Sequence, residues 1–216
     1  MSLSSLSLPW KYLPGPLVFV DVETTGVGRA DRVVELAAIR VAPDEPVQVL
    51  NTLIDPGVRP VGAAHVHRIT GEVLDGAPAF ESVVPALAQL SDGATLVAHN
   101  ASFEQRMLSG ELARLGGVWG VPALCTYALS RRAHPERNVR GARTLTSLVN
   151  LHRLTMDGHA HAAWPDARVL PELLVCLLNR AESAAQTAGW IRQCIKPAPE
   201  PKWPAVPWSS APLKPR

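Results

Sequence analysis

The sequence is poor in cysteine and in long apolar runs, and each shortage excludes a class of protein. Its three cysteines, Cys125, Cys176 and Cys194, form no CxxC pair among the 216 residues. We therefore expect neither a zinc site nor a disulfide framework, which fits a reducing cytoplasm. No segment reaches about 20 uninterrupted apolar residues, the length of a membrane span. The first residues lack the basic start and apolar centre of a secretory signal. These shortages predict a cytoplasmic protein that does not bind a membrane.

A strong charge of one sign is also missing. The formal net charge is +2, which is too small to indicate a nucleic-acid-binding protein by itself. Some basic residues are nevertheless clustered, because Arg131, Arg132, Arg137, Arg140 and Arg143 lie within thirteen positions. Such a loop is either a solvated basic surface or, beside a catalytic site, a holder of substrate phosphates.

Length and composition predict one folded domain with an extension at each end. With 216 residues, 47% of them hydrophobic, the chain can bury one good core. We assign residues 1–15 to an N-terminal extension, 16–195 to the domain and 196–216 to an extended tail rich in proline and tryptophan. Trp203 and Trp208 leave two interpretations of the tail. It is either a stiff polyproline linker, or a segment that docks on the domain or on a partner.

Hydrophobic patterning predicts an α/β fold. Three successive strands are expected over residues 17–22, 32–41 and 47–54, with short connections that suit antiparallel pairing. A helix over 79–90, a strand over 95–98 and a helix over 102–115 are expected to follow. Pro171 is expected to kink or restart the last long helix, because proline removes an interior backbone hydrogen bond.

Two acidic residues stand at the end of the first predicted strand. Asp21 and Glu23 follow the apolar run of residues 17–20, and residues two apart in a strand project from the same face. Two carboxylates so placed repel each other unless a cation joins them. The pair is therefore either half of a Mg²⁺ or Mn²⁺ site or a strand end whose acids face water.

Further candidate ligands lie downstream. Glu104 falls in the first turn of the helix that follows residues 95–98. Asp166 stands at the head of the last long helical stretch, where the helix dipole favours its charge. His161 precedes Asp166 by five residues, and His159 is the alternative histidine. Four acids with a histidine make the set that a divalent-metal nuclease requires.

At this point the chain resembles the DEDDh 3′→5′ exonucleases, relatives of the proofreading ε subunit of bacterial DNA polymerase III. The matching motifs are residues 20–26, 67–71, 78–80, 97–103 and the group His161, Asp166 and Ala167. The resemblance implies a ribonuclease-H-like fold, a mixed β-sheet flanked by helices with the first strand central. Residues 16–195 are then the exonuclease domain.

The resemblance also implies a reaction. The family hydrolyses phosphodiester bonds at the 3′ ends of single-stranded or frayed nucleic acid, and we expect DNA to be favoured here. Asp21, Glu23 and Asp166 would hold the first of two Mg²⁺ or Mn²⁺ ions, and Asp21, with Glu104 through water, would serve the second. His161 would be the general base, because imidazole can remove a proton from water near neutrality.

Substrate contacts are expected from two segments. The residues that follow Glu23 would hold the terminal base, and residues 97–103 offer further candidates. The full set is Thr24, Thr25, Gly26, Val27, His99, Asn100 and Phe103. For His99 we favour a hydrogen bond to backbone over metal ligation, and for His67 a structural role in its turn.

One residue departs from the family pattern. The family has Asp where this chain has Glu104, and the added methylene is comparable to the ~1 Å misplacement that can cost about 10²-fold in rate. Glu remains a hard-oxygen ligand, and an acid that binds through water can absorb extra length. We expect altered metal use in an exonuclease that acts alone or with a DNA polymerase or another replication or repair protein. The alternative is a catalytically weakened module that binds nucleic acid or docks on a partner.

Overall fold

The computed structural model describes residues 8–59, 61–156, 158, 161–206 and 214. Six strands form one mixed sheet in the order β3-β2-β1-β4-β5-β6. The first three, β1 (Leu17–Thr24), β2 (Val33–Val41) and β3 (Gln48–Leu53), pair antiparallel. On the other side of β1, β4 (Thr95–Ala98) and β5 (Ala123–Cys125) run parallel to it, and the short β6 (Ile195–Lys196) closes the far edge antiparallel. The predicted antiparallel hairpins and the interior position of the first strand are confirmed.

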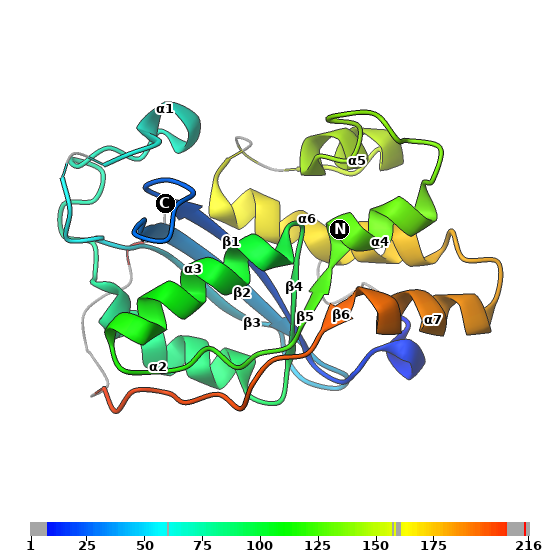
Figure 1. The fold of residues 1–216 in the computed structure, drawn as a ribbon, viewed down its shortest axis with the longest axis horizontal. Coiled ribbons are helices and arrows are strands. Elements are labelled where there is room, and N and C mark those ends of the chain that lie inside the picture. Colours follow the sequence, from blue (N-terminus) through cyan, green and yellow to red (C-terminus); the bar gives the residue numbers. More distant parts are fainter. Residues whose placement is uncertain (1–7, 60, 157, 159–160, 207–213, 215–216) are drawn as a thin grey trace.

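Helices cover both faces of this sheet (Figure 1). They are α1 (Ala64–His67), α2 (Phe80–Ser91), α3 (Ala101–Arg114), α4 (Thr126–Ala133), α5 (Leu145–His152), α6 (Ala163–Leu178) and α7 (Ala184–Cys194). The predicted mixed sheet flanked by helices is therefore confirmed. Among the described residues, none of these helices is both long and apolar enough to pass through a bilayer.

The alternation of side chains along β1 divides the core into two layers. Val18 and Val20 pack with the apolar faces of α2 and α3, whereas Leu17 and Phe19 pack with α4, α6 and α7. Asp21 continues the second series, because every second residue of a strand faces the same side. The first strand thus carries its acids toward the face that α6 covers.

Of the two expected effects of Pro171 on the last long helix, a kink or a restart, the restart is wrong. The helix runs without interruption from Ala163 to Leu178, so it does not restart at Pro171. Proline removes one backbone hydrogen bond, but Pro171 and its neighbours Leu170 and Leu174 are buried. Burial of such side chains contributes about 1.5–3 kcal/mol each, which offsets the loss of one bond.

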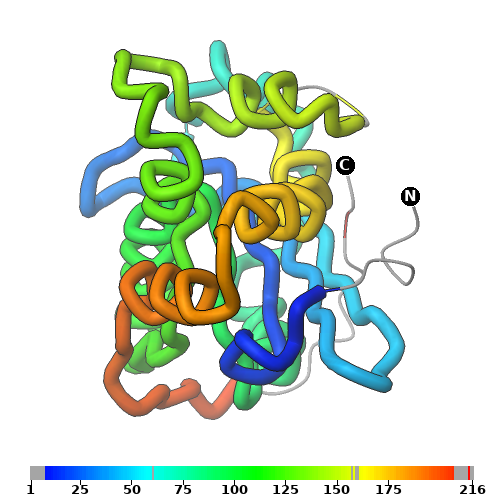
Figure 2. The backbone as a smooth tube through the Cα atoms, turned by 90° about the vertical axis from the view of Figure 1, so that its right-hand side faces the viewer, coloured from blue at the N-terminus to red at the C-terminus, as the bar shows by residue number. Residues whose placement is uncertain are grey.

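The proline-rich tail lies on the domain as far as residue 206. Figures 1 and 2 show its orange-red segment along the lower edge of the molecule. Lys202 and Val118 exchange two backbone hydrogen bonds (2.7 and 3.0 Å), and Trp203 packs edge-to-face on Trp119 with ring centroids 5.7 Å apart. Farther on, the Lys214 carbonyl accepts a hydrogen bond from the Leu53 amide in β3 (2.8 Å). Trp208 lies outside the described residues.

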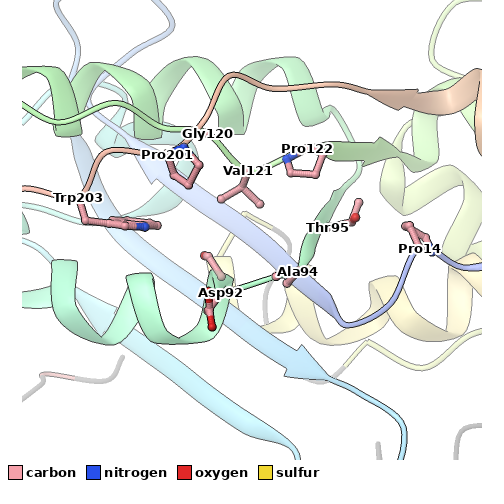
Figure 3. A pocket seen from close by; sticks show the side chains of 11 residues that line it. Pro14, Asp92, Ala94, Thr95, Gly120, Val121, Pro122, Pro201 and Trp203 are labelled. Carbon is pink, nitrogen blue, oxygen red and sulfur yellow. The ribbon is translucent and has the colours of Figure 1, made fainter.

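Where the tail crosses the domain it helps to enclose a cavity of about 340 Å³. Pro201 and Trp203 line it together with Val121, which lies beside Pro201, and with Thr95 (Figure 3). Thr95 begins β4, whereas the acidic motifs follow the other end of that strand. The cavity is therefore at the opposite end of the sheet from the acidic residues.

Candidate functional site

Asp21 and Glu23 lie within β1 and not at its end, because the strand continues to Thr24. Both are half-buried, while Val20, Val22 and Thr24 between and beside them are buried. This alternation puts the two carboxylates on one face, as predicted from their spacing. The register with β2 shifts between Glu23 and Thr24, and bulges of this kind often redirect a strand beside a functional site.

Three of the predicted residues converge. One ligand atom each from Glu23, His161 and Asp166 lie within 4.8 Å of one another. Asp166 stands in the first turn of α6, as expected. His161 precedes that helix, is exposed, and has a φ of 63°, a left-handed backbone conformation that is uncommon for residues other than glycine. His159 lies outside the described residues.

Glu104 approaches from a second helix. It lies in the first turn of α3, its residue is only 4% exposed, and its Oε2 has no hydrogen-bond partner in the described part of the chain. Burial raises the pKa of Glu104 to about 8. Its charge also raises the pKa of Asp21, which places the two carboxyl groups within electrostatic reach of each other.

The electrostatics of the site favour a cation. Burial, and then the charges of Asp166, Glu104 and Glu23, raise the pKa of Asp21 well above its ordinary value. Burial also raises the pKa of Asp166 to about 6, although the neighbouring His161 opposes this shift. Oδ1 of Asp166 has no hydrogen-bond partner within the described ranges. Buried carboxylates that crowd together and keep unpaired oxygens suit a hard divalent cation such as Mg²⁺ or Mn²⁺.

One acid at this site was missed by the sequence analysis. Glu35 of β2 is fully buried and lies directly opposite Glu23 in the strand pairing. Its charge contributes to the raised pKa values of both Asp21 and Asp166, after larger effects that include burial. The available signal was a single acid within the apolar run of residues 33–39.

The segment after the first motif folds into a tight loop. Thr24 Oγ1 donates to the Gly26 carbonyl (2.7 Å), and Thr25 Oγ1 donates to Asp31 (2.9 Å). A Cβ on Gly26 would lie 2.6 Å from the Asp31 carboxylate, so this position excludes a side chain unless Asp31 moves. Val27 is 77% exposed beside this loop, which leaves it open for contact with a ligand.

His67 has the structural role expected from sequence. The imidazole is buried, its Nε2 lies 3.1 Å from the Thr24 carbonyl, and its Nδ1 accepts from the Ile69 amide (3.0 Å). The ring therefore connects the turn after α1 to the end of β1.

The substrate-contact candidates in residues 97–103 differ in how far their side chains are free to contact a ligand. Both ring nitrogens of His99 face protein groups, the Arg143 carbonyl at 2.8 Å and Thr126 Oγ1 at 3.1 Å. This agrees with the expected backbone hydrogen bond. Asn100 is exposed, and Phe103 is half-buried with the Arg106 guanidinium 5.2 Å from its ring centroid.

The arginine cluster is used in part by its own loop. Arg143 is buried and donates to the His134 carbonyl (3.0 Å). Arg137 donates to the Ala142 carbonyl (3.0 Å). These two guanidinium groups hold the loop between α4 and α5, a role that differs from both the solvated surface and the phosphate contact considered from sequence.

Comparison with known families gives a match that covers most of the chain. The model of the RNase_T family, described as an exonuclease family, matches residues 18–174. Among curated proteins, "DNA polymerase III PolC-type" of Caldanaerobacter subterraneus subsp. tengcongensis is 28% identical over 174 residues, which is 79% of this chain and 12% of that protein. "DNA polymerase III subunit epsilon-like protein" of Rhodobacter capsulatus is 38% identical over 119 residues, 52% of this chain and 17% of that protein. The chain thus spans only a small part of either relative.

Solved structures give the same fold. A structure of Exonuclease X in complex with 5′ overhanging duplex DNA has a TM-score of 0.61 and 27% identity, covering 81% of this chain and 99% of that one. A full-length 3′-exonuclease has a TM-score of 0.65 at 12% identity, covering 93% and 96%. At that identity the second likeness shows the fold alone.

Proposed function

The chain belongs to the RNase_T exonuclease family, with the acidic motifs of its DEDDh members, and on that premise we propose that it removes nucleotides from 3′ ends. The proposed substrate is single-stranded or frayed nucleic acid, with DNA favoured. The observation that carries the proposal is the convergence of Glu23, His161 and Asp166 within 4.8 Å, beside the carboxylates of Asp21 and Glu104. Phosphodiester hydrolysis needs positive charge at the phosphate and a base for water, and this set can provide for both.

We assign the carboxylates to two divalent ions. Asp21, Glu23 and Asp166 would hold one ion, and Asp21, with Glu104 through water, the other. When bound, such ions supply positive charge at the scissile phosphate and lower the pKa of water. The unpaired oxygens of Glu104 and Asp166 support this assignment, because a buried oxygen without a partner is costly unless a cation or water satisfies it.

His161 is the proposed general base. Its imidazole is exposed and lies beside Glu23 and Asp166, so one ring nitrogen can take a proton from the attacking water. It lies just before α6 in an uncommon backbone conformation, with a φ of 63°. Histidine is the side chain that most often serves as a general base.

Substrate and partner proposals follow from the loop and the relatives. The terminal nucleotide would lie on the loop of Thr24 to Val27, with Asn100 and Phe103 as further contacts. Separating the terminal nucleotide from its neighbours costs least on a single strand. The exposed Val27 offers an apolar surface for its base. The DNA complex of Exonuclease X and the polymerase names of the curated relatives support DNA as substrate and association with a DNA polymerase.

Replacing one carboxylate tests the proposed function. Asp21→Asn should abolish cleavage of a 3′-ended oligonucleotide while folding and DNA binding are retained, because it removes charge without changing size. The control is Asp92→Asn, which should keep wild-type cleavage, since Asp92 is an exposed acid beside the cavity at the opposite end of the sheet. Cleavage by Asp21→Asn at the wild-type rate would contradict the metal assignment.

Glu104 favours a second candidate function. Its raised pKa opposes the ionised form that a metal ligand needs, which would suit a weakened nuclease that binds nucleic acid or recruits a partner. If the wild-type chain is inactive, the substitution Glu104→Asp decides the cause. Restored cleavage would show that the extra methylene of Glu104 causes the inactivity. Continued inactivity would show that this residue is not the cause.

A further inference from the structure

The beginning of α6 is held by the sheet. Ala163 is the first residue of this helix, and the N-cap residue Ala162 supplies no side-chain hydrogen bond. The first amides of a helix have no partner within the helix. Here the Ala163 amide donates to Oε2 of Glu35 (3.1 Å), so a carboxylate 128 residues earlier in the chain performs the capping function.

Glu35 links this cap to the first strand. It pairs with Glu23 across β1 and β2, and residues that are directly opposite in an antiparallel pair have side chains on the same face. The side chain of Glu35 is therefore fixed on one side by the strand that carries Glu23. On its other side Glu35 accepts a hydrogen bond from Ala163 at the start of α6. That helix carries Asp166, and His161 lies two residues before Ala163.

We propose that Glu35 is a positioning residue that sets the separation between Glu23 and the pair His161 and Asp166. This inference rests on the proposed function of that site. Its distinctive feature is a fully buried acid placed among other acids, an arrangement whose electrostatic cost needs compensation. A capping serine or threonine on the helix itself could satisfy another amide of the first turn at lower cost, but it would not connect the helix to the paired strands β1 and β2.

Two substitutions separate the hydrogen bond from the charge. Glu35→Gln keeps the size of the side chain and an oxygen that can accept from Ala163, whereas Glu35→Met keeps the approximate size and removes the acceptor. The matched control is Ser183→Ala, which removes the side-chain acceptor at the start of α7, where Ser183 accepts from the Gln186 amide (3.1 Å). That helix carries none of the proposed ligands.

Three measurements are compared in the full chain: hydrogen exchange of the backbone amides of residues 163, 164 and 166, Mn²⁺ affinity by electron paramagnetic resonance, and steady-state cleavage of an oligonucleotide. We expect Glu35→Met to increase the exchange rate at least tenfold, weaken Mn²⁺ binding at least tenfold and lower kcat with little change in KM. Glu35→Gln should keep the exchange rate, the Mn²⁺ affinity and kcat close to their wild-type values. Ser183→Ala should reduce thermal stability while leaving Mn²⁺ affinity and kcat at wild-type values.

Exchange and Mn²⁺ affinity test the inference independently of the reaction. If the wild-type chain fails to cleave, the proposed function fails, while these two measurements still decide whether Glu35 holds the helix and the metal site. Wild-type exchange and wild-type Mn²⁺ affinity in Glu35→Met would overturn the inference. So would equal defects in Glu35→Met and Ser183→Ala, because a general loss of stability would then explain both.

Discussion

Arg32 and Glu111 form a two-pronged ion pair that fastens α3 to the sheet. Arg32 Nε lies 2.8 Å from Oε1 and Nη2 lies 2.9 Å from Oε2 of Glu111, whose carboxylate also accepts from the Val33 amide (3.0 Å). The Glu111 side chain is 2% exposed. Because Glu104 lies on the same helix, this pair holds one of the proposed metal ligands in place.

Removing the cation of this pair should destabilise the fold. Arg32→Met leaves the Glu111 carboxylate buried without its partner, a change that costs about 3–5 kcal/mol for a fully buried pair. Arg32 is 25% exposed, so we expect about 2 kcal/mol in urea unfolding at pH 7. Arg114→Met is the control, because Arg114 is 3.8 Å from Glu111 and more exposed. Equal losses in the two variants would contradict this account.

The metal-free protein should lose stability as the pH rises from about 5 to 8. Burial raises the pKa of Glu104 to about 8 and that of Asp166 to about 6. At a pH between the pKa of such a group in the unfolded state and its higher pKa in the folded state, the folded state binds more protons. The free energy of unfolding therefore falls as the pH rises through this range. Urea unfolding in EDTA at pH 5, 6.5 and 8 measures the effect.

Glu104→Gln supplies the comparison for this pH dependence. The variant cannot ionise at position 104, so its free energy of unfolding should fall less steeply between pH 5 and 8 than that of the wild type. Added Mn²⁺ should stabilise the wild type most at pH 8. An identical pH slope in the variant, or stability that increases up to pH 8 in EDTA, would show that folding does not raise the pKa of Glu104.

The two histidines before α6 should differ in their effect on the reaction. His161→Ala removes the proposed base, and general-base catalysis contributes typically about 10²–10⁴-fold, so single-turnover cleavage should slow by that order. His159→Ala is the control and should stay within about threefold of wild type. The reverse ranking would assign the base to His159.

The tail should contribute to stability through Trp203. Its ring packs against Trp119 and against the core layer of α2 and α3. Replacing a fully buried tryptophan by alanine lowers the free energy of unfolding by about 3–5 kcal/mol. Because Trp203 is only partly buried, Trp203→Ala should cost about 2 kcal/mol, with kcat unchanged since the contact lies at the opposite end of the sheet. An unchanged unfolding midpoint would make the contact energetically neutral.

Local patterns in the sequence were sufficient for most strands and for the spacing of the acids. Residues 95–98 were predicted as a strand and form β4 (Thr95–Ala98). The first strand is longer than expected, because Thr24 still pairs with Val33 after the shift in register. Asp166 was placed correctly in the first turn of its helix because proline and acidic residues are typical of helix beginnings.

The features that the sequence did not predict depend on contacts between residues far apart in the chain. Glu35 appears in sequence as one acid in an apolar strand, and nothing nearby indicates that its partner is the Ala163 amide. The Arg32–Glu111 pair joins residues that are 79 positions apart. The contact of Trp203 with Trp119 could be anticipated only as docking on an unspecified surface, since tertiary packing determines which surface the tail meets.

The most direct test of the central claim is the product ladder from labelled oligonucleotides. Purified full-length chain is incubated with 3′- or 5′-labelled single-stranded DNA and RNA in Mg²⁺, Mn²⁺ or EDTA, beside Asp21→Asn. We predict stepwise shortening from the 3′ end that requires metal, is faster on DNA, and is absent in the variant. Failure of the wild type to cleave either nucleic acid with either metal, or shortening from the 5′ end, would contradict the proposed exonuclease.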